Sequence, residues 1–410
     1  MRLCASFVPL ILLAQTTWAG PTRSGSEISC GQPQSTAASF SGIEQFSPEL
    51  QGILSSIPEI AARPRSGRPP WNKPALGAGR IELPNGGVAY SYCDPEARLE
   101  KPDLRVANYN IYMGGTWRAD QAREKLIQLA GQPPGMDHTT SAERAELFRE
   151  MKYSTSIAHV LKNLEALGPL DVLGLQEVEM NSRRTEGNDP ADIIAHHFGL
   201  CGVYSRADTI NAIGERVPFG NAIFSRYPFA DRFDYHYRAD NRSGVVDNLT
   251  FERRSVAGIK IKAHRGSKSQ DLYFLSTHLS EGWKHEIEFT DRMTQAQQLK
   301  EFTRSWGGRH VMIMGDFNTN PGGREVAELT RMTPRHRRQG YPTFKVVNEL
   351  TNHGNMNIGS WSGNNAQTSS QLDHIYVAGF GKARGFHHWA PPVKAEQGSD
   401  HLPVVLKIDL

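Results

Sequence analysis

Residues 311–318 have the sequence Val-Met-Ile-Met-Gly-Asp-Phe-Asn, in which an apolar run leads into two polar residues, Asp316 and Asn318. A short uncharged run of this kind is typical of a buried strand. Side chains two positions apart in an extended chain face the same side, so Asp316 and Asn318 can reach one site together. The stretch therefore predicts a buried strand that carries two polar groups to its carboxyl end.

The same pattern occurs elsewhere in the chain. Asn110, Glu177 and His278 follow the apolar runs near 106, 172 and 274, and Asp400 and His401 precede the run near 404. With the run that leads into Asp316, this makes five strands with polar ends. One polar residue after a strand is usually a turn residue, but five such endings in one chain indicate a shared site. Asp, Glu and Asn supply the oxygen ligands that Mg²⁺ and Mn²⁺ prefer, whereas zinc favours more His and Cys. Histidines beside such a cation indicate proton transfer or charge stabilisation at a phosphate.

Short apolar segments recur from residue 104 to the end of the chain. They contain the Val, Ile, Leu and Phe residues that are common in buried strands, and they lie at 104–109, 171–178, 221–226, 256–262, 272–279, 310–316, 372–378 and 403–410. Helical patterns occur at 141–167 and at 285–306. Because strands and helices do not alternate strictly, we expect sheets faced by helices, an α/β fold, and not a βα barrel.

A set of motifs in this order resembles the endonuclease/exonuclease/phosphatase superfamily. The motifs are Tyr-Asn-Ile at 109–111, Leu-Gln-Glu-Val at 175–178, Gly-Asn-Ala-Ile-Phe-Ser-Arg at 220–226, Ser-Thr-His-Leu at 276–279, Gly-Asp-Phe-Asn at 315–318, Leu-Asp-His-Ile at 372–375 and Ser-Asp-His-Leu-Pro-Val at 399–404. The resemblance implies a four-layer αββα sandwich, with two mainly antiparallel β-sheets flanked by helices. It also implies a metal-dependent hydrolase that acts on phosphoric ester bonds.

The resemblance further implies a metal site. Glu177 is the expected main ligand, helped by Asn110 and Asp400. The expected ion is Mg²⁺, with Mn²⁺ as the alternative. A bound cation of this kind would neutralise charge that grows on the phosphoryl oxygens during in-line attack by water.

Five further residues acquire catalytic roles from the resemblance. Asp316 would orient or deprotonate the attacking water, and Asn318 would hold a phosphate oxygen. His401 would activate the water, with Asp373 fixing its tautomer. His278 would contact the phosphate or assist the leaving group. A carboxylate behind an imidazole raises its basicity and determines which nitrogen is free.

The substrate is left open by the sequence. A net charge of +3 is weak for a dedicated nucleic-acid binder. The resemblance allows a nucleic acid or a phospholipid headgroup, with specificity expected in loops at 114–140, 228–250 and 332–370. The arginine-rich stretch at 331–338 is either a solvated surface or an approach surface for a polyanion. We expect a monomer.

Two other classes of function are weighed against hydrolysis of a phosphoester. Residues 359–363, Gly-Ser-Trp-Ser-Gly, match the turn that carries the nucleophile of serine hydrolases. That turn needs a strand before it and a helix after it, whereas the flanks here are polar. The other alternative is a catalytically inactive module that binds a phosphate ligand; against it, every matched position of the motifs is filled.

The first part of the chain is expected to direct secretion. Residues 1–19 have the pattern of a signal peptide, with Arg2, a short apolar run at 7–13 and small residues near the end. We therefore expect a secreted protein, or a periplasmic one in a bacterium, in which no later apolar run spans a membrane. Residues 20–100 are interpreted as an extension with a hairpin near 80–92, and residues 101–410 as the catalytic domain.

Cysteine content supports one disulfide in the mature protein. Removal of a signal peptide takes away Cys4 and leaves Cys30, Cys93 and Cys201. An odd number in a secreted chain indicates one bridge and one remaining thiol. Although sequence does not fix the connectivity, we expect Cys30 to pair with Cys93, which leaves Cys201 free.

Overall fold

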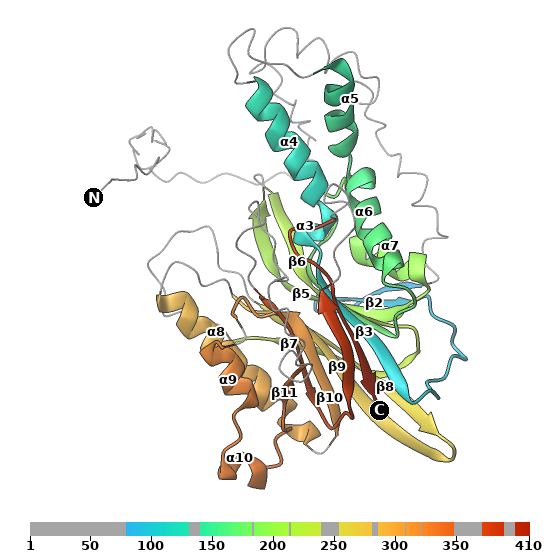
Figure 1. The fold of residues 1–410 in the computed structure, drawn as a ribbon, viewed down its shortest axis with the longest axis vertical. Coiled ribbons are helices and arrows are strands. Elements are labelled where there is room, and N and C mark those ends of the chain that lie inside the picture. Colours follow the sequence, from blue (N-terminus) through green and yellow to red (C-terminus); the bar gives the residue numbers. More distant parts are fainter. Residues whose placement is uncertain are drawn as a thin grey trace, which may run out of the picture. The chain divides into compact units, whose positions relative to one another are not determined.

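The protein is described by a computed structural model, which covers residues 79–130, 140–182, 184–212, 215–238, 254–280, 286–307, 309–320, 322–347, 371–388 and 398–410. Two β-sheets lie at the centre of this part of the chain (Figure 1). The larger sheet has the strand order β1-β2-β5-β6-β4-β3-β14-β13. In that order, its strands are Arg80–Glu82, Val88–Ser91, Cys201–Ala212, Glu215–Ser225, Val172–Glu179, Asp103–Asn110, Val404–Asp409 and Ala383–His388.

The smaller sheet has the order β11-β12-β10-β9-β8-β7. Its strands, in the same order, are Lys345–Val346, Asp373–Ala378, His310–Asp316, Lys268–His278, Ser255–Arg265 and Phe229–His236. Each sheet is mixed, with one parallel pair among its described strands: β3 with β4 in the larger sheet and β9 with β10 in the smaller. The other neighbours are antiparallel. The expectation of mainly antiparallel sheets is confirmed.

Helices cover the outer faces of both sheets. On the side of the larger sheet they are α3 (Tyr112–Gly115), α4 (Trp117–Ala130), α5 (Ser141–Glu150), α6 (Tyr153–Ala166) and α7 (Pro190–Phe198). On the side of the smaller sheet they are α8 (Glu286–Phe302), the 3₁₀ helix η3 (Thr303–Trp306), α9 (Arg324–Thr330) and α10 (Pro334–Arg338). No helix in the described ranges is long and apolar enough to cross a membrane.

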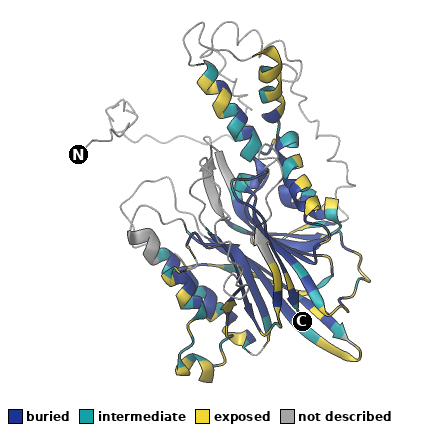
Figure 2. Ribbon diagram, viewed as in Figure 1, coloured by how far each residue is buried: buried dark blue, intermediate teal, exposed yellow. Residues whose placement is uncertain are grey.

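Three buried apolar clusters define four layers. One joins α6 and α7 to the outer face of the larger sheet, and another joins α8 and α9 to the outer face of the smaller sheet. The third fills the space between the sheets. Alternation along β10 illustrates the arrangement, because Val311 and Ile313 face the helices whereas Met312 and Met314 face the other sheet. Figure 2 shows the strands largely buried, and the expected αββα sandwich is confirmed.

Sequence periodicity misplaced several elements. The helix expected at 141–167 is two helices, because Lys152 adopts an extended conformation between them. The loop expected at 114–140 contains α4, whose buried face is made largely of alanine and therefore gives a weak apolar pattern. The loop expected at 228–250 contains β7, an edge strand in which no residue is buried. The segments 1–19, 20–78 and 359–363 lie outside the described residues.

The first hairpin belongs to the larger sheet. Strand β2 pairs with β5, and this register places Ser91 opposite Cys201. Cys93 lies just beyond the paired residues and forms a disulfide with Cys201 across a separation of 108 residues. The expected Cys30–Cys93 bridge with a free Cys201 is therefore wrong. Strand pairing, which cysteine spacing does not reveal, brings the two cysteines together.

Candidate active site

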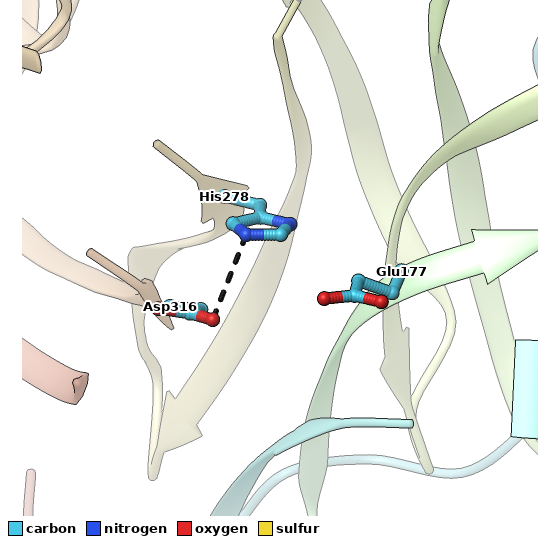
Figure 3. A group of neighbouring side chains, drawn as sticks. All are labelled: Glu177, His278 and Asp316. Carbon is cyan, nitrogen blue, oxygen red and sulfur yellow. Dashed lines mark ion pairs between the residues drawn. The ribbon is translucent and has the colours of Figure 1, made fainter. Parts of the chain in front are cut away.

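The two parallel strand pairs bring polar residues to one end of the sandwich. Asn110 ends β3, and Glu177 lies near the end of its parallel neighbour β4. In the other sheet, His278 and Asp316 end β9 and β10 and stand opposite one another in the register. Because parallel strands end at the same edge, each sheet contributes a polar pair to the same region. Figure 3 shows the Glu177 side chain directed toward His278 and Asp316.

The amide of Asn110 joins carboxylates from both sheets. Its Nδ2 atom donates to Glu177 Oε1 at 2.9 Å and to Asp316 Oδ2 at 3.0 Å, and it lies 3.4 Å from His401 Nε2. Its Oδ1 atom accepts a hydrogen bond from the backbone N–H of Tyr112 at 3.0 Å. In this arrangement Asn110 acts as a hydrogen-bond donor to the site, and its oxygen is directed to the backbone.

Glu177 is held by strained backbone. Its φ is +56°, at a shift in the register between β4 and β6. Its Oε2 atom accepts from the N–H of Met113 at 3.1 Å, and both Tyr112 and Met113 also have positive φ, at +48° and +43°. Non-glycine residues in this region cost of the order of 1–2 kcal/mol each, and such conformations are concentrated at functional sites. The strained turn thus fixes the Glu177 carboxylate toward the space between the sheets.

Glu177 and Asp316 share a high affinity for protons. Burial and, next, the negative charge of Asp400 raise the pKa of Glu177 to about 7. Burial also raises the pKa of Asp316 to about 7, although the charge of His401 opposes this effect. Crowded buried carboxylates of this kind are stabilised either by protons or by a cation. The donor set therefore fits a hard divalent cation.

One ligand atom from each of Glu177, His278 and Asp316 lies within 4.8 Å of the others. His278 is the weakest ligand of the three, because Arg254 Nη1 donates to its Nδ1 at 2.9 Å. Burial and the charge of Arg254 lower the pKa of His278 well below its usual value. A neutral ring that accepts at Nδ1 carries its proton on Nε2, which then has no lone pair for a metal. The carboxylates are the better ligands.

Asn318 completes this side of the site. Its φ is +49°, its backbone N–H donates to Asp316 Oδ1 at 2.8 Å, and its Nδ2 donates to the Leu279 carbonyl at 2.9 Å. The same Nδ2 lies 3.0 Å from His278 Nε2. Asn318 is therefore beside both Asp316 and His278, where an amide can also meet a substrate oxygen.

His401 and Asp373 form a buried pair. His401 Nδ1 lies 2.7 Å from Asp373 Oδ2, which leaves Nε2 facing Asp316 Oδ2 at 3.6 Å. Burial alone would lower the pKa of His401, but the negative charges of Asp373, Asp316 and Asp400 outweigh it and raise this pKa well above its usual value. The arrangement supplies an imidazole with a fixed tautomer and a strong affinity for a proton.

Ser399 connects the 399–401 turn to β3. Its Oγ donates to the Asn110 carbonyl at 2.7 Å and accepts from the His401 N–H at 3.1 Å. Asp400 lies between these two residues, and its Oδ1 is 3.3 Å from Ser399 Oγ. Its charge reaches Glu177, as the raised pKa of that residue shows.

The structure brings all eight predicted residues into one region and places beside them Arg254, which sequence reasoning missed. Arg254 is 4% exposed and stands just before β8, without any motif that distinguishes it from an ordinary arginine at the start of a strand. The basic stretch at 331–338 is elsewhere. Gly340, just after α10, contacts Gly307, which precedes β10, so α10 lies near the opposite end of β10 from Asp316.

Comparisons with known proteins identify the family. The model of the Endonuclease/Exonuclease/phosphatase family matches residues 107–401. A search of curated proteins gave no significant match.

The chain is also similar to several solved structures, at low sequence identity. A mannosyl-6-phosphatase from Bacteroides thetaiotaomicron is 16% identical, with 75% of this chain and 100% of that chain covered and a TM-score of 0.46. TDP2 from C. elegans is 16% identical, with 77% of each chain covered and a TM-score of 0.44. The human Nocturnin catalytic domain is 15% identical, with 76% and 96% covered and a TM-score of 0.46.

The family model spans more than half of the chain and includes all eight site residues. Members of this family are phosphoester hydrolases that depend on a divalent metal. The chain belongs to the endonuclease/exonuclease/phosphatase family.

Proposed function

We propose that this protein is a secreted, Mg²⁺-dependent phosphodiesterase that uses water as the nucleophile. One observation carries the proposal: the Asn110 amide joins two buried carboxylates from different sheets, Glu177 and Asp316, directly beside His401. Burial of a carboxylate without a compensating charge costs folding free energy. A site that brings two of them together is therefore suited to a cation and to proton transfer.

Glu177 would hold the cation, with Asp400, whose charge reaches Glu177, as the second ligand. Asn110 was expected as a further ligand, but its oxygen accepts from the Tyr112 N–H, so its amide serves the carboxylates as a donor instead. When bound, the cation would polarise a phosphoryl oxygen and neutralise the charge that develops on it. Asn110 also keeps Glu177 and Asp316 in place through its two donated hydrogen bonds.

Asp316 and His401 would prepare the attacking water. Their facing atoms, Oδ2 and Nε2, are 3.6 Å apart, so one water can contact both. As the water oxygen attacks phosphorus, the proton of the water would pass to this pair. The P–O bond on the opposite side breaks, and the leaving oxygen departs as an alkoxide that takes up a proton from solvent. Asp373 stabilises the imidazolium and keeps Nε2 directed at the water.

His278 and Asn318 would bind the phosphate. The neutral His278 ring carries a proton on Nε2, and the Asn318 amide is beside it. Two neutral donors stabilise a phosphoryl oxygen as its charge grows, and neither donor has to change protonation state.

The substrate is proposed to be a phosphodiester in a nucleic acid or in a phospholipid headgroup. The Cys93–Cys201 disulfide supports a secreted protein, because disulfides persist in oxidising compartments and are rare in the cytosol.

A substrate panel tests the proposal. Plasmid DNA, RNA, sphingomyelin and bis(p-nitrophenyl) phosphate are each incubated with Mg²⁺ or with chelator, and p-nitrophenyl phosphate serves as the monoester arm. We expect at least one diester to be cleaved faster than the monoester, in the presence of Mg²⁺ and not of chelator. Equal cleavage in chelator would refute metal dependence. Calorimetric binding of Mg²⁺ without turnover of any substrate would favour the non-catalytic binding module.

A further inference from the structure

A second buried amide, that of Asn108, contacts Asp373 on the side away from His401. Asn108 lies on β3, two residues before Asn110, and its side chain faces the space between the sheets. Its Nδ2 atom donates to Asp373 Oδ1 at 3.0 Å, while the other oxygen of the same carboxylate contacts His401. We propose that Asn108 is a positioning residue, which fixes the Asp373 carboxylate and through it the direction of the His401 ring. This inference rests on the proposed hydrolytic function.

The Asp373 carboxylate needs such a partner. The last torsion of an aspartate side chain is broad and roughly two-fold, so a hydrogen bond at one oxygen defines its plane poorly. A donor at each oxygen defines it well. His401 supplies one contact at Oδ2 and Asn108 supplies the other at Oδ1. Loss of the Asn108 amide would leave the plane of the carboxylate, and hence the imidazole, less well fixed.

The amide of Asn108 has a defined orientation. Gln176 on β4 donates from Nε2 to Asn108 Oδ1 at 2.7 Å, and from the same atom to Ser276 Oγ at 2.9 Å. Because Asn108 Oδ1 faces a donor, its Nδ2 must face Asp373. Ser276 in turn donates to the Leu175 carbonyl at 3.0 Å. This chain of contacts, which we call the inter-sheet polar network, consists of Asn108, Gln176, Ser276 and Asp373.

The inter-sheet polar network lies within the apolar layer between the two sheets. All four of its residues are fully buried, and they come from strands of both sheets. Buried polar groups in such a place destabilise the fold unless they are satisfied, and an apolar residue at position 108 would pack there at lower cost. An amide at this position is therefore explained by what it holds, the carboxylate behind His401.

The matched control is a buried amide on a helix that packs against the other face of β3. Asn163 on α6 is 1% exposed, and its Nδ2 donates to the Tyr109 hydroxyl at 3.2 Å. It resembles Asn108 in residue type, burial and contact with β3, but its amide donates to a tyrosine hydroxyl and not to the carboxylate that contacts His401. Asn163→Leu should therefore change the free energy of unfolding without a specific effect on kcat.

The test combines Asn108→Leu with three backgrounds: wild type, His278→Ala and His401→Ala. Hydrolysis of the diester cleaved best in the substrate panel is measured with Mg²⁺. We expect Asn108→Leu to lower kcat by about 10- to 100-fold, with little change in KM, in the wild-type and His278→Ala backgrounds. In the His401→Ala background we expect no further loss, because the residue through which Asn108 acts is gone. An equal loss in all three backgrounds, or no loss in wild type, would overturn the proposal.

A readout that does not need activity separates this proposal from the proposed function. The Nδ1 proton of His401 is followed by nuclear magnetic resonance in ¹⁵N-histidine-labelled protein. We expect Asn108→Leu to shift and broaden this resonance, while Asn163→Leu leaves it unchanged. If wild-type protein cleaves no phosphodiester, the proposed function fails and the resonance alone decides. An unchanged resonance in Asn108→Leu would refute the positioning role.

Discussion

The Nδ2 atom of Asn110 lies 3.0 Å from Oδ2 of Asp316, and this contact connects the end of β3 in one sheet to the end of β10 in the other. The candidate active site is therefore an interface between the two sheets. Its geometry depends on how the sheets pack, so variants of site residues should affect stability as well as activity. The predictions below separate the two effects.

Asp316→Asn should abolish most turnover while the protein stays folded. The amide keeps the size of the side chain but is a far weaker proton acceptor than the carboxylate, and loss of a general base costs typically about 10²- to 10⁴-fold. Steady-state kinetics with Mg²⁺ measures the loss, and circular dichroism checks folding. Asp231→Asn, at an exposed position on β7, is the control and should keep full activity. Turnover within a few-fold of wild type in Asp316→Asn would contradict the assignment.

Glu177→Gln should stabilise the metal-free protein at alkaline pH. The pKa of Glu177 is raised from 4.5 to about 7, so its ionisation costs folding free energy that appears as pH rises from about 5 to 8. The variant avoids this cost, which is of the order of 1–3 kcal/mol. Urea unfolding in chelator should therefore show a difference at pH 8 that disappears near pH 4.5. A difference of the same size at both values would show that ionisation is not its cause.

Binding of a divalent cation should release protons. At pH 6 the raised pKa values of Glu177 and Asp316, each about 7, leave both groups partly protonated, and a cation displaces those protons. Calorimetric titration with Mg²⁺ in two buffers of different ionisation enthalpy counts the protons released. We expect release at pH 6 and little at pH 8.5. Glu177→Gln should reduce the number at pH 6, and equal numbers at both pH values would contradict the prediction.

Removal of the disulfide should destabilise the protein without a direct effect on the site. The Cys93–Cys201 bridge closes a long loop, with a separation of 108 residues, and bridges of this kind contribute about 2–5 kcal/mol. The double variant Cys93→Ser with Cys201→Ser should unfold at lower urea concentration and keep wild-type kcat at low temperature. Reduction of wild-type protein should reproduce the loss of stability. If the double variant is as stable as wild type, the bridge does not form.

The polar residues at the ends of buried strands could be predicted from the sequence, because the pattern depends only on neighbouring residues. The apolar run that leads into Asp316 and Asn318 is buried as a strand, and the run before Glu177 behaves in the same way. Helix boundaries were less predictable. The alanine-rich face of α4 gave no strong periodic pattern, although the helix packs against α5 and α6 in the fold.

Residues that act through others could not be predicted. Arg254 and Asn108 belong to no motif, and their significance lies in contacts with His278 and Asp373, 24 and 265 residues further along the chain. The disulfide partner of Cys93 was predicted incorrectly for the same reason. The pairing of β2 with β5, which brings Cys201 to Cys93, joins segments that are far apart in the sequence.

The amino-acid sequence was enough to place Asn110, Glu177, His278 and Asp316 at or near the ends of apolar strands, because burial of a strand and the polarity of its end depend on neighbouring residues. The order of the motifs also determined the family. Packing of the two sheets was needed to show which of these groups meet, which imidazole has the higher affinity for a proton and which cysteines pair. Those properties depend on distances across two sheets and on the desolvation of charges between them, which exist only once the sandwich is packed.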